Sequence, residues 1–126
     1  PDLNQDPRDP RDTTTPYHMA TDLRTLTLGD ALASPDEKAL IGWLRANTTG
    51  DERIKAGLPR GWVVADKTGT SGAYGVANDV AVAWPPSRAP VVIAVFSNRT
   101  AAGGKADDRV VATTASIVIR ALGLAT

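Results

Sequence analysis

Helical hydrophobic patterns fill the first half of the chain after a polar opening. Residues 1–15 are rich in turn formers and charges and have no apolar period, which predicts a loop. Thr15 and Pro16 then give a helix-start signal, and apolar residues follow at helical spacing. The sequence SPDE, which begins at Ser34, predicts a second helix with Ser34 as the N-cap of a capping box. Helices are therefore expected within residues 16–58, the last of them one short turn.

The pattern changes from helical period to β-rich runs at residue 62. Three such runs, WVVADKTGT, YGVANDVAVAW and APVVIAVF, are separated by the short segments SGA and PPSR. This spacing predicts an antiparallel meander of three strands within residues 62–98. Residues 105–123 return to helical period and predict a C-terminal helix. The order of elements indicates an α+β fold in which helices cover an antiparallel sheet.

Composition narrows the classes of partner. The chain of 126 residues has single-domain size, and its 14 basic and 14 acidic side chains cancel, so no net field would attract nucleic acid or an anionic membrane. The longest apolar run, residues 91–96, is too short to span a bilayer. The sequence contains no cysteine and no metal-ligand spacing, which excludes disulfides, thiolate metal sites and a cysteine nucleophile. We therefore expect a small or specific partner and no cofactor.

The histidine and the tryptophans offer little chemistry of their own. His18 is the single histidine and has no carboxylate or cysteine pattern beside it, so it is expected on a helix surface. Trp43, Trp62 and Trp84 are expected to pack against the core and not to hold a ligand.

The stretch VVADKTGTSGAYG places a lysine inside a predicted strand. Lys67 has a simple interpretation as a solvated strand residue whose stem lies along apolar neighbours. The residues that follow are all small, however, and small residues let a ligand lie directly against the backbone. An ammonium group, several hydroxyls and exposed strand N–H groups would then converge on one surface. That combination suits an anionic ligand.

The same stretch resembles a known family. Lys67, Thr68 and Gly69 match the K-T-G box of the serine penicillin-recognising enzymes, which include the class A β-lactamases. Around it, PDLN, DPRDTTTP, LTLGDAL and WLRANTTGDERIKAGLP follow in the order and spacing of class A β-lactamases, and the resemblance covers nearly all of the chain. It implies the α+β penicillin-recognising fold. The form KTGTSGAYGVAND is most similar to the branch whose carbapenem-hydrolysing members often carry cysteine where Ser71 stands.

The resemblance implies roles for the residues of this strand. Lys67 would place positive charge beside the substrate carboxylate and the catalytic groups. The hydroxyls of Thr68 and Thr70 would hydrogen-bond that carboxylate, with Gly69 and Ser71 completing the substrate-binding strand. The backbone N–H of Thr70 would supply half of the oxyanion hole.

Further roles are implied outside the strand. Arg53 matches a position where some class A enzymes carry an arginine that reinforces carboxylate binding, and Arg99 is a second candidate for that task. Asn4 matches the omega-loop asparagine that orients the deacylating water, and Asp12 matches the aspartate that closes the loop by pairing with an upstream arginine. A solvated helix charge for Arg53, a turn residue for Asn4 and a cap for Asp12 are the simpler alternatives. The loop between Asn4 and Asp12 is one residue shorter than in common relatives.

Several parts of the family's catalytic machinery are absent from the sequence. It contains no S-x-x-K and no S-D-N, and the omega-loop glutamate would stand immediately before Pro1. Residues 1–126 are therefore expected to be the C-terminal segment of one catalytic domain, with residues 1–15 the remainder of the omega loop. The N-terminal segment of the same enzyme would supply the serine, the lysine and the glutamate. The resemblance further implies a monomeric enzyme in the periplasm or outside the cell.

Three functions are compatible with these residues. The leading interpretation is hydrolysis of the β-lactam ring of penicillin- or cephalosporin-type antibiotics through a serine acyl-enzyme. A penicillin-binding D,D-peptidase shares the K-T-G strand but acts on peptidoglycan. A non-catalytic ligand-binding module could use the glycines at 69, 72 and 75 to hold a phosphate, although the sequence has no Walker pattern.

Overall fold

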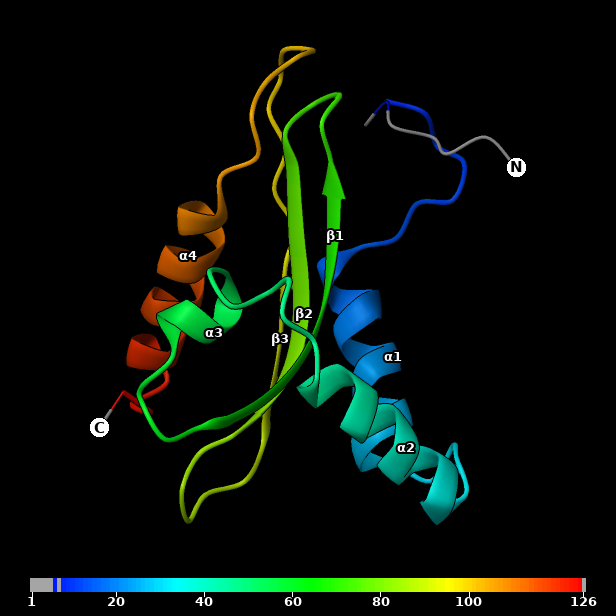
Figure 1. Cartoon of the computed structure of the whole chain (residues 1–126), viewed down its shortest axis with the longest axis vertical. Helices are drawn as coiled ribbons and strands as arrows, with labels where there is room; N and C mark the ends of the chain where they lie inside the picture. Colours follow the sequence, from blue (N-terminus) through cyan, green and yellow to red (C-terminus); the bar gives the residue numbers. More distant parts are fainter. Residues whose placement is uncertain (1–5, 7, 126) are drawn as a thin grey trace.

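The computed structural model describes residues 6 and 8–125, and it consists of one antiparallel sheet with helices on both faces (Figure 1). The order of elements agrees with the α+β fold predicted from the sequence. In chain order they are α1 (Pro16–Leu28), α2 (Ser34–Arg45), α3 (Ile54–Gly57), β1 (Val63–Ser71), β2 (Val76–Trp84), β3 (Val91–Val95) and α4 (Asp108–Ala121).

The three strands form the predicted meander. Their order in the sheet is β1-β2-β3, and both pairs are antiparallel. Lys67 pairs with Val80, and Val80 in turn pairs with Ala94 on β3. Because β2 lies in the middle, β1 keeps one free edge within the described part of the chain. The strand that carries the K-T-G sequence is therefore accessible from its side.

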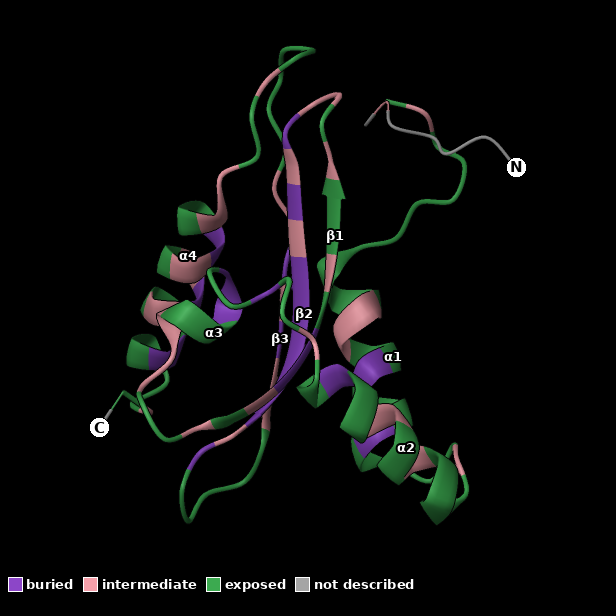
Figure 2. Cartoon of the chain, in the orientation of Figure 1, coloured by how far each residue is buried: buried purple, intermediate pink, exposed green. Residues whose placement is uncertain are grey.

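The two faces of the sheet have separate cores. Helices α3 and α4 cover one face, where Ala77 and Ala81 of β2 pack with residues of both helices, and α1 and α2 lie on the other, where Val80 and Val82 pack (Figure 1). Neighbouring residues of β2 thus serve opposite cores, as strand alternation requires. Both faces of β2 are buried along most of its length (Figure 2), which explains why its sequence is nearly continuous in small apolar residues.

Local capping signals place two of the helices. The hydroxyl of Thr15 accepts a hydrogen bond from the backbone N–H of His18 at 3.2 Å, and Pro16 occupies the first turn of α1, as predicted. At α4, the carboxylate of Asp107 accepts a hydrogen bond from the N–H of Arg109. In both cases a side-chain oxygen satisfies a backbone donor that the first turn leaves free.

The predicted capping box at Ser34 is wrong. Helix α2 has Ala33 as its N-cap, and Ser34 is the first helical residue and makes no side-chain cap bond. The reason is that the carbonyl of Ala33 accepts the N–H groups of both Asp36 and Glu37, which closes the first turn one residue earlier. The last turn of the same helix carries Arg45, which suits the negative helix terminus.

The prediction that Trp43 packs against the core is also wrong. Its side chain is 73% exposed, although we expected it to pack. On α2 the inward position is taken by Leu44, and one residue of helical rotation separates Trp43 from that side. His18 is exposed on α1, as expected. No helix in the described residues combines the length and the apolarity needed to cross a membrane.

Candidate active site

Side chains of β1 alternate between two different environments at residues 67–70. Lys67 pairs with Val80, so it faces the side of the sheet that α1 and α2 cover. Thr70 pairs with Ala77, so it faces the side that α3 and α4 cover. The K-T-G-T sequence therefore presents Lys67 on one face and the two threonine hydroxyls on the other.

An open pocket of about 360 Å³ lies on the Lys67 face. Lys67 lines it together with Asn78 of β2, Met19 of α1 and Phe96. The ammonium group donates a hydrogen bond to the carbonyl of Thr68 at 2.7 Å, and the lysine is exposed. It therefore stays on the surface of the strand, over the pocket.

Gly69 keeps this face of the strand open. A Cβ added there would contact only Cβ of Asn78, at an ordinary 3.7 Å. Packing within the chain therefore does not require glycine at this position. The absence of a side chain leaves room for a ligand against the backbone, beside the ammonium of Lys67.

The backbone N–H of Thr70 points toward the free edge of the sheet. Ala77, its partner on β2, donates its N–H to the carbonyl of Ser97 beyond β3, at 3.0 Å. In an antiparallel strand the N–H and C=O of one residue point to the same neighbour. The N–H and C=O of Ala77 therefore point away from β1. Thr70 and Ala77 form a non-hydrogen-bonded pair of the antiparallel ladder. The N–H of Thr70 is thus directed out of the sheet, where an oxyanion donor would have to lie.

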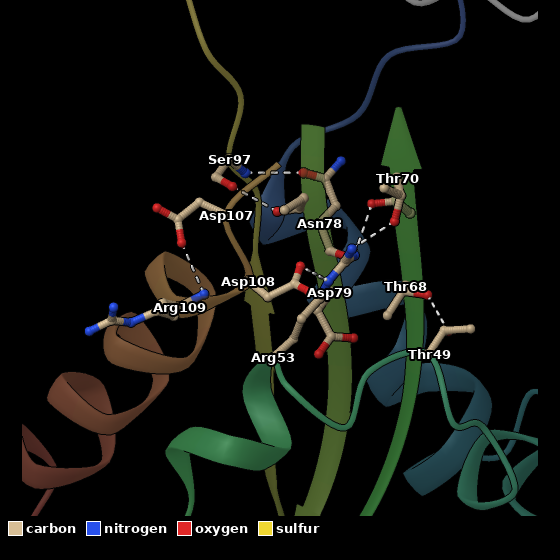
Figure 3. Close-up of polar contacts among 12 residues, drawn as sticks. Thr49, Arg53, Thr68, Thr70, Asn78, Asp79, Ser97, Asp107, Asp108 and Arg109 are labelled. Carbon is tan, nitrogen blue, oxygen red and sulfur yellow. Dashed lines mark hydrogen bonds and ion pairs between the residues drawn. The ribbon is translucent and has the colours of Figure 1, made fainter. Parts of the chain in front are cut away.

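Arg53 is buried behind this strand and makes four hydrogen bonds (Figure 3). The arginine is 4% exposed. One nitrogen, Nη2, donates to the hydroxyl of Thr70 at 2.7 Å, and Nη1 donates to the carbonyls of Gly69 at 3.2 Å and Asn78 at 2.8 Å. The remaining bond joins Nε to the carboxylate of Asp108 at 2.8 Å. The structure therefore brings together two residues that the resemblance assigned to carboxylate binding.

The second arginine candidate lies elsewhere. Nη2 of Arg99 pairs with the carboxylate of Asp107 at 3.1 Å, and its Nε donates to the carbonyl of Lys105. These bonds tie the segment after β3 to the start of α4. Within the described residues Arg53, and not Arg99, contacts the K-T-G strand.

The other two residues proposed for this strand have local partners. The hydroxyl of Thr68 lies 2.6 Å from that of Thr49, which also donates to the side-chain oxygen of Asn47 (Figure 3). Ser71 accepts a hydrogen bond from the N–H of Ala73 in the turn between β1 and β2. Both side chains are therefore held in place by neighbouring polar groups.

Two strand residues carry buried carboxyl groups, Asp66 on β1 and Asp79 on β2, and the sequence analysis missed both. Asp66 is 2% exposed and accepts a hydrogen bond from the Asn47 side chain. Asp79 is 0% exposed and accepts one from the N–H of Ile54 at 3.0 Å. Burial raises the pKa of both carboxyls, that of Asp79 to about 7, and the nearby Asp66 charge adds to the shift at Asp79. A signal existed in VANDVAVAW, which places an amide and an acid inside an otherwise apolar strand.

Gly50 allows the strand to approach its supporting loop closely. A Cβ at this position would lie 2.0 Å from Oδ2 of Asp66, a distance that real side chains do not tolerate. The glycine therefore lets the loop after α2 pack directly on the buried carboxylate. This contact fixes the strand one residue before Lys67.

The segment before α1 is described only in part. Asn4 lies outside the described residues, so its role with the deacylating water stays a prediction. Asp12 lines the pocket and has a positive φ of 54°, and among the described residues it has no ion pair. Its pairing with an upstream arginine also stays a prediction. The guanidinium of Arg8 lies 3.3 Å from the hydroxyl of Tyr74, which joins this segment to the β1–β2 turn.

The assembled groups can bind an anion and stabilise negative charge. Lys67 supplies an ammonium, Arg53 supplies a guanidinium hydrogen-bonded to Thr70, and the edge of β1 supplies an N–H donor. Within the described residues, no cluster of three or more His, Cys, Asp or Glu side chains could hold a metal ion. The site therefore consists of cationic groups and hydrogen-bond donors along one strand, beside an open pocket.

Comparisons with known proteins give the family. The sequence model of the Beta-lactamase2 group, described as the beta-lactamase enzyme family, matches residues 1–123. Beta-lactamase AST-1 of Nocardia asteroides is 54% identical over 93% of this chain and 37% of its own length. Carbapenem-hydrolyzing beta-lactamase KPC of Klebsiella oxytoca is 46% identical over 94% of this chain and 40% of its own length. The chain thus spans less than half the length of these relatives.

A solved structure agrees with these matches. The crystal structure of a beta-lactamase from Streptosporangium roseum superposes with a TM-score of 0.91 at 52% sequence identity, over 96% of this chain and 46% of that one. The α+β fold predicted from the sequence is confirmed, and so is the resemblance that the K-T-G strand first indicated. The chain belongs to the beta-lactamase enzyme family.

Proposed function

We propose that the enzyme containing these residues hydrolyses the β-lactam ring of penicillin- or cephalosporin-type antibiotics through a serine acyl-enzyme of the class A kind. One observation carries the proposal: two cationic side chains, Lys67 and Arg53, flank the same edge-strand segment from opposite faces. A β-lactam antibiotic carries a carboxylate next to a strained amide, so it needs a cation and an oxyanion donor close together. The names of the related proteins support the same substrate class.

Carboxylate recognition would use Arg53 and Thr70 as a unit. The Thr70 hydroxyl accepts a hydrogen bond from Arg53, which leaves its own proton free to donate to a substrate carboxylate. Thr68 differs, because Thr49 already donates to Asn47, and the proton between the two threonines must then come from Thr68. Thr70 is therefore the hydroxyl that is ready to donate, and Thr68 would have to rotate first.

Transition-state stabilisation would use the edge of β1. The N–H of Thr70 points out of the sheet, and it would donate to the oxygen that becomes negative as the β-lactam carbonyl turns tetrahedral. Lys67 would add positive charge from the other face of the strand. Neither group is a nucleophile or a general base, so both act by lowering the energy of charge that develops in the reaction.

The nucleophile would come from the remainder of the enzyme. The sequence of this chain has no S-x-x-K, so we propose that an N-terminal segment supplies the serine, its lysine and the glutamate base and packs over the Lys67 face. In the same proposal Asn4 orients the deacylating water, and the complete enzyme is a monomer of the periplasm or the extracellular space. Residues 1–126 alone should then show no turnover.

The test is to follow a chromogenic cephalosporin and a penicillin with the complete enzyme, by absorbance and by mass spectrometry of the protein. We expect many turnovers per enzyme and an acyl adduct that decays during turnover. An adduct that persists for hours would favour the D,D-peptidase. Nucleotide binding, measured by tryptophan fluorescence, without any β-lactam adduct would favour the binding module. Enzymatic rates from residues 1–126 alone would contradict the division of roles proposed above.

A further inference from the structure

The short helix α3 is capped in an unusual way. Arg53 stands at its N-cap position, where a side-chain oxygen would normally accept a backbone N–H of the first turn. The Arg53 side chain cannot accept a hydrogen bond, and it extends to β1 instead. The first N–H of the helix, that of Ile54, is satisfied from the sheet by Oδ2 of Asp79 at 3.0 Å (Figure 3 labels Arg53 and Asp79).

We propose that Asp79 is a positioning residue for the Arg53 guanidinium, an inference that rests on the proposed function. Asp79 lies on β2 directly opposite Thr68 of the K-T-G strand. Its bond to Ile54 fixes the peptide that follows Arg53, so it ties the base of the arginine to the same sheet that the guanidinium contacts. The arginine is thereby held at both ends, at its backbone through Asp79 and at its head group through Thr70.

The two oxygens of Asp79 differ in their hydrogen bonding. Oδ1 is buried and has no hydrogen-bond partner among the described residues. An unpaired buried oxygen costs stability, and a neutral acceptor would cap Ile54 without bringing a charge into the core. The positive charge of Arg53 acts on Asp79, where it lowers the carboxyl pKa against the larger effect of burial.

Asp79 would act through Arg53 and would not touch the substrate. Loss of the Ile54 bond would let the start of α3 shift and would move the guanidinium relative to the Thr70 hydroxyl. Binding of the substrate carboxylate should suffer more than the chemical step, because the backbone N–H of Thr70 is positioned by the pairing of β1 with β2, and Lys67 lies on the opposite face of the strand. The expected signature is a rise in KM with little change in kcat.

The test is a double-mutant cycle in the complete enzyme. Asp79→Ala removes the acceptor, whereas Asp79→Asn keeps an oxygen for the Ile54 N–H and serves as the matched control. We expect Asp79→Ala to raise KM about tenfold with kcat within about threefold, and Asp79→Asn to stay within about twofold in both. In an Arg53→Ala background, Asp79→Ala should leave KM unchanged, because the residue to be positioned is gone.

Two results would overturn the inference. One is an equal rise in KM on Asp79→Ala with and without Arg53, and the other is a loss of kcat at unchanged KM. If Asp79→Ala does not fold, Asp79→Leu replaces it, because leucine fills the same space without an acceptor.

A second measurement separates this inference from the proposed function. The Nε–H resonance of Arg53 in an NMR spectrum should move in Asp79→Ala and stay in place in Asp79→Asn, whether or not any β-lactam is hydrolysed. An unchanged resonance in Asp79→Ala would refute the positioning role. Absence of turnover in the unmodified enzyme, with the expected NMR result, would refute only the proposed function.

Discussion

The two faces of β1 at residues 67–70 differ in how many contacts hold their cationic side chains. On the α3 side, Arg53 is buried, and its hydrogen bonds reach the strand, its neighbour β2 and α4. On the α1 side, Lys67 is exposed beside an open pocket, and its ammonium group donates to the carbonyl of the next residue. Four hydrogen bonds therefore hold the Arg53 side in place within this chain, whereas the Lys67 side lies open to whatever packs against it.

Removal of the buried cation should have the largest effect on stability. Arg53→Ala deletes four hydrogen bonds, leaves the carboxylate of Asp108 without its cation and leaves the carbonyls of Gly69 and Asn78 without this donor. A buried acceptor left without its donor typically costs about 1–3 kcal/mol, so the several lost bonds should lower the free energy of unfolding by about 3 kcal/mol, measured by urea denaturation. The matched control is Lys55→Ala, which removes an exposed pair with Asp51 and should leave stability nearly unchanged. Equal effects of the two changes would mean that burial does not distinguish the two ion pairs.

Removal of the exposed cation should instead affect catalysis and leave the fold intact. Lys67→Ala in the complete enzyme should lower kcat/KM about 100-fold, or about 2.7 kcal/mol, because it removes charge from both the carboxylate site and the transition state. The unfolding midpoint should stay constant, since the bond from the ammonium to the Thr68 carbonyl lies on the exposed edge of the strand. Thr70→Ala should lower kcat/KM less, by about tenfold, because its backbone N–H survives. If both substitutions proved harmless, the roles assigned to this strand would be wrong.

The stability of the fold should also depend on pH, because Asp79 is buried. The folded-state pKa of Asp79 is raised to about 7, so the folded protein keeps a proton that the unfolded chain releases above about pH 4. Protonated Asp79 therefore contributes fully to the free energy of unfolding at low pH, and this contribution is lost as the pH rises toward 7. Asp79→Asn should therefore become more stable relative to the unmodified protein by about 2 kcal/mol between pH 5 and pH 8. Urea denaturation at the two pH values measures this, and parallel stability curves would contradict the raised pKa.

Local sequence signals predicted the elements better than they predicted the site. The start of α1 was predictable because Thr15 and Pro16 act within one turn, and the strands were predictable because β-rich runs are bounded by turn residues. The capping box at Ser34 failed although its pattern is as strong. The preceding carbonyl of Ala33 competes for the same backbone donors, and a residue pattern does not reveal that competition.

The site depends on contacts between distant residues. The resemblance indicated Arg53 and Thr70, but their hydrogen bond follows from how α3 sits on the sheet. Asp79 was missed because its role depends on a hydrogen bond to Ile54, which is 25 positions away in the chain. The exposure of Trp43 was missed for the same reason, since helical periodicity does not say which side a short helix turns to its neighbours.

The bond from the Lys67 ammonium to the Thr68 carbonyl has a consequence for self-association. An exposed edge strand is a template on which a second chain can add its own strand. At this point of β1 the acceptor is already occupied by a charged group from the adjacent residue, and bringing another backbone alongside would require that charge to be displaced or desolvated. The same lysine thus discourages intermolecular sheet growth while the edge remains available to a small anion.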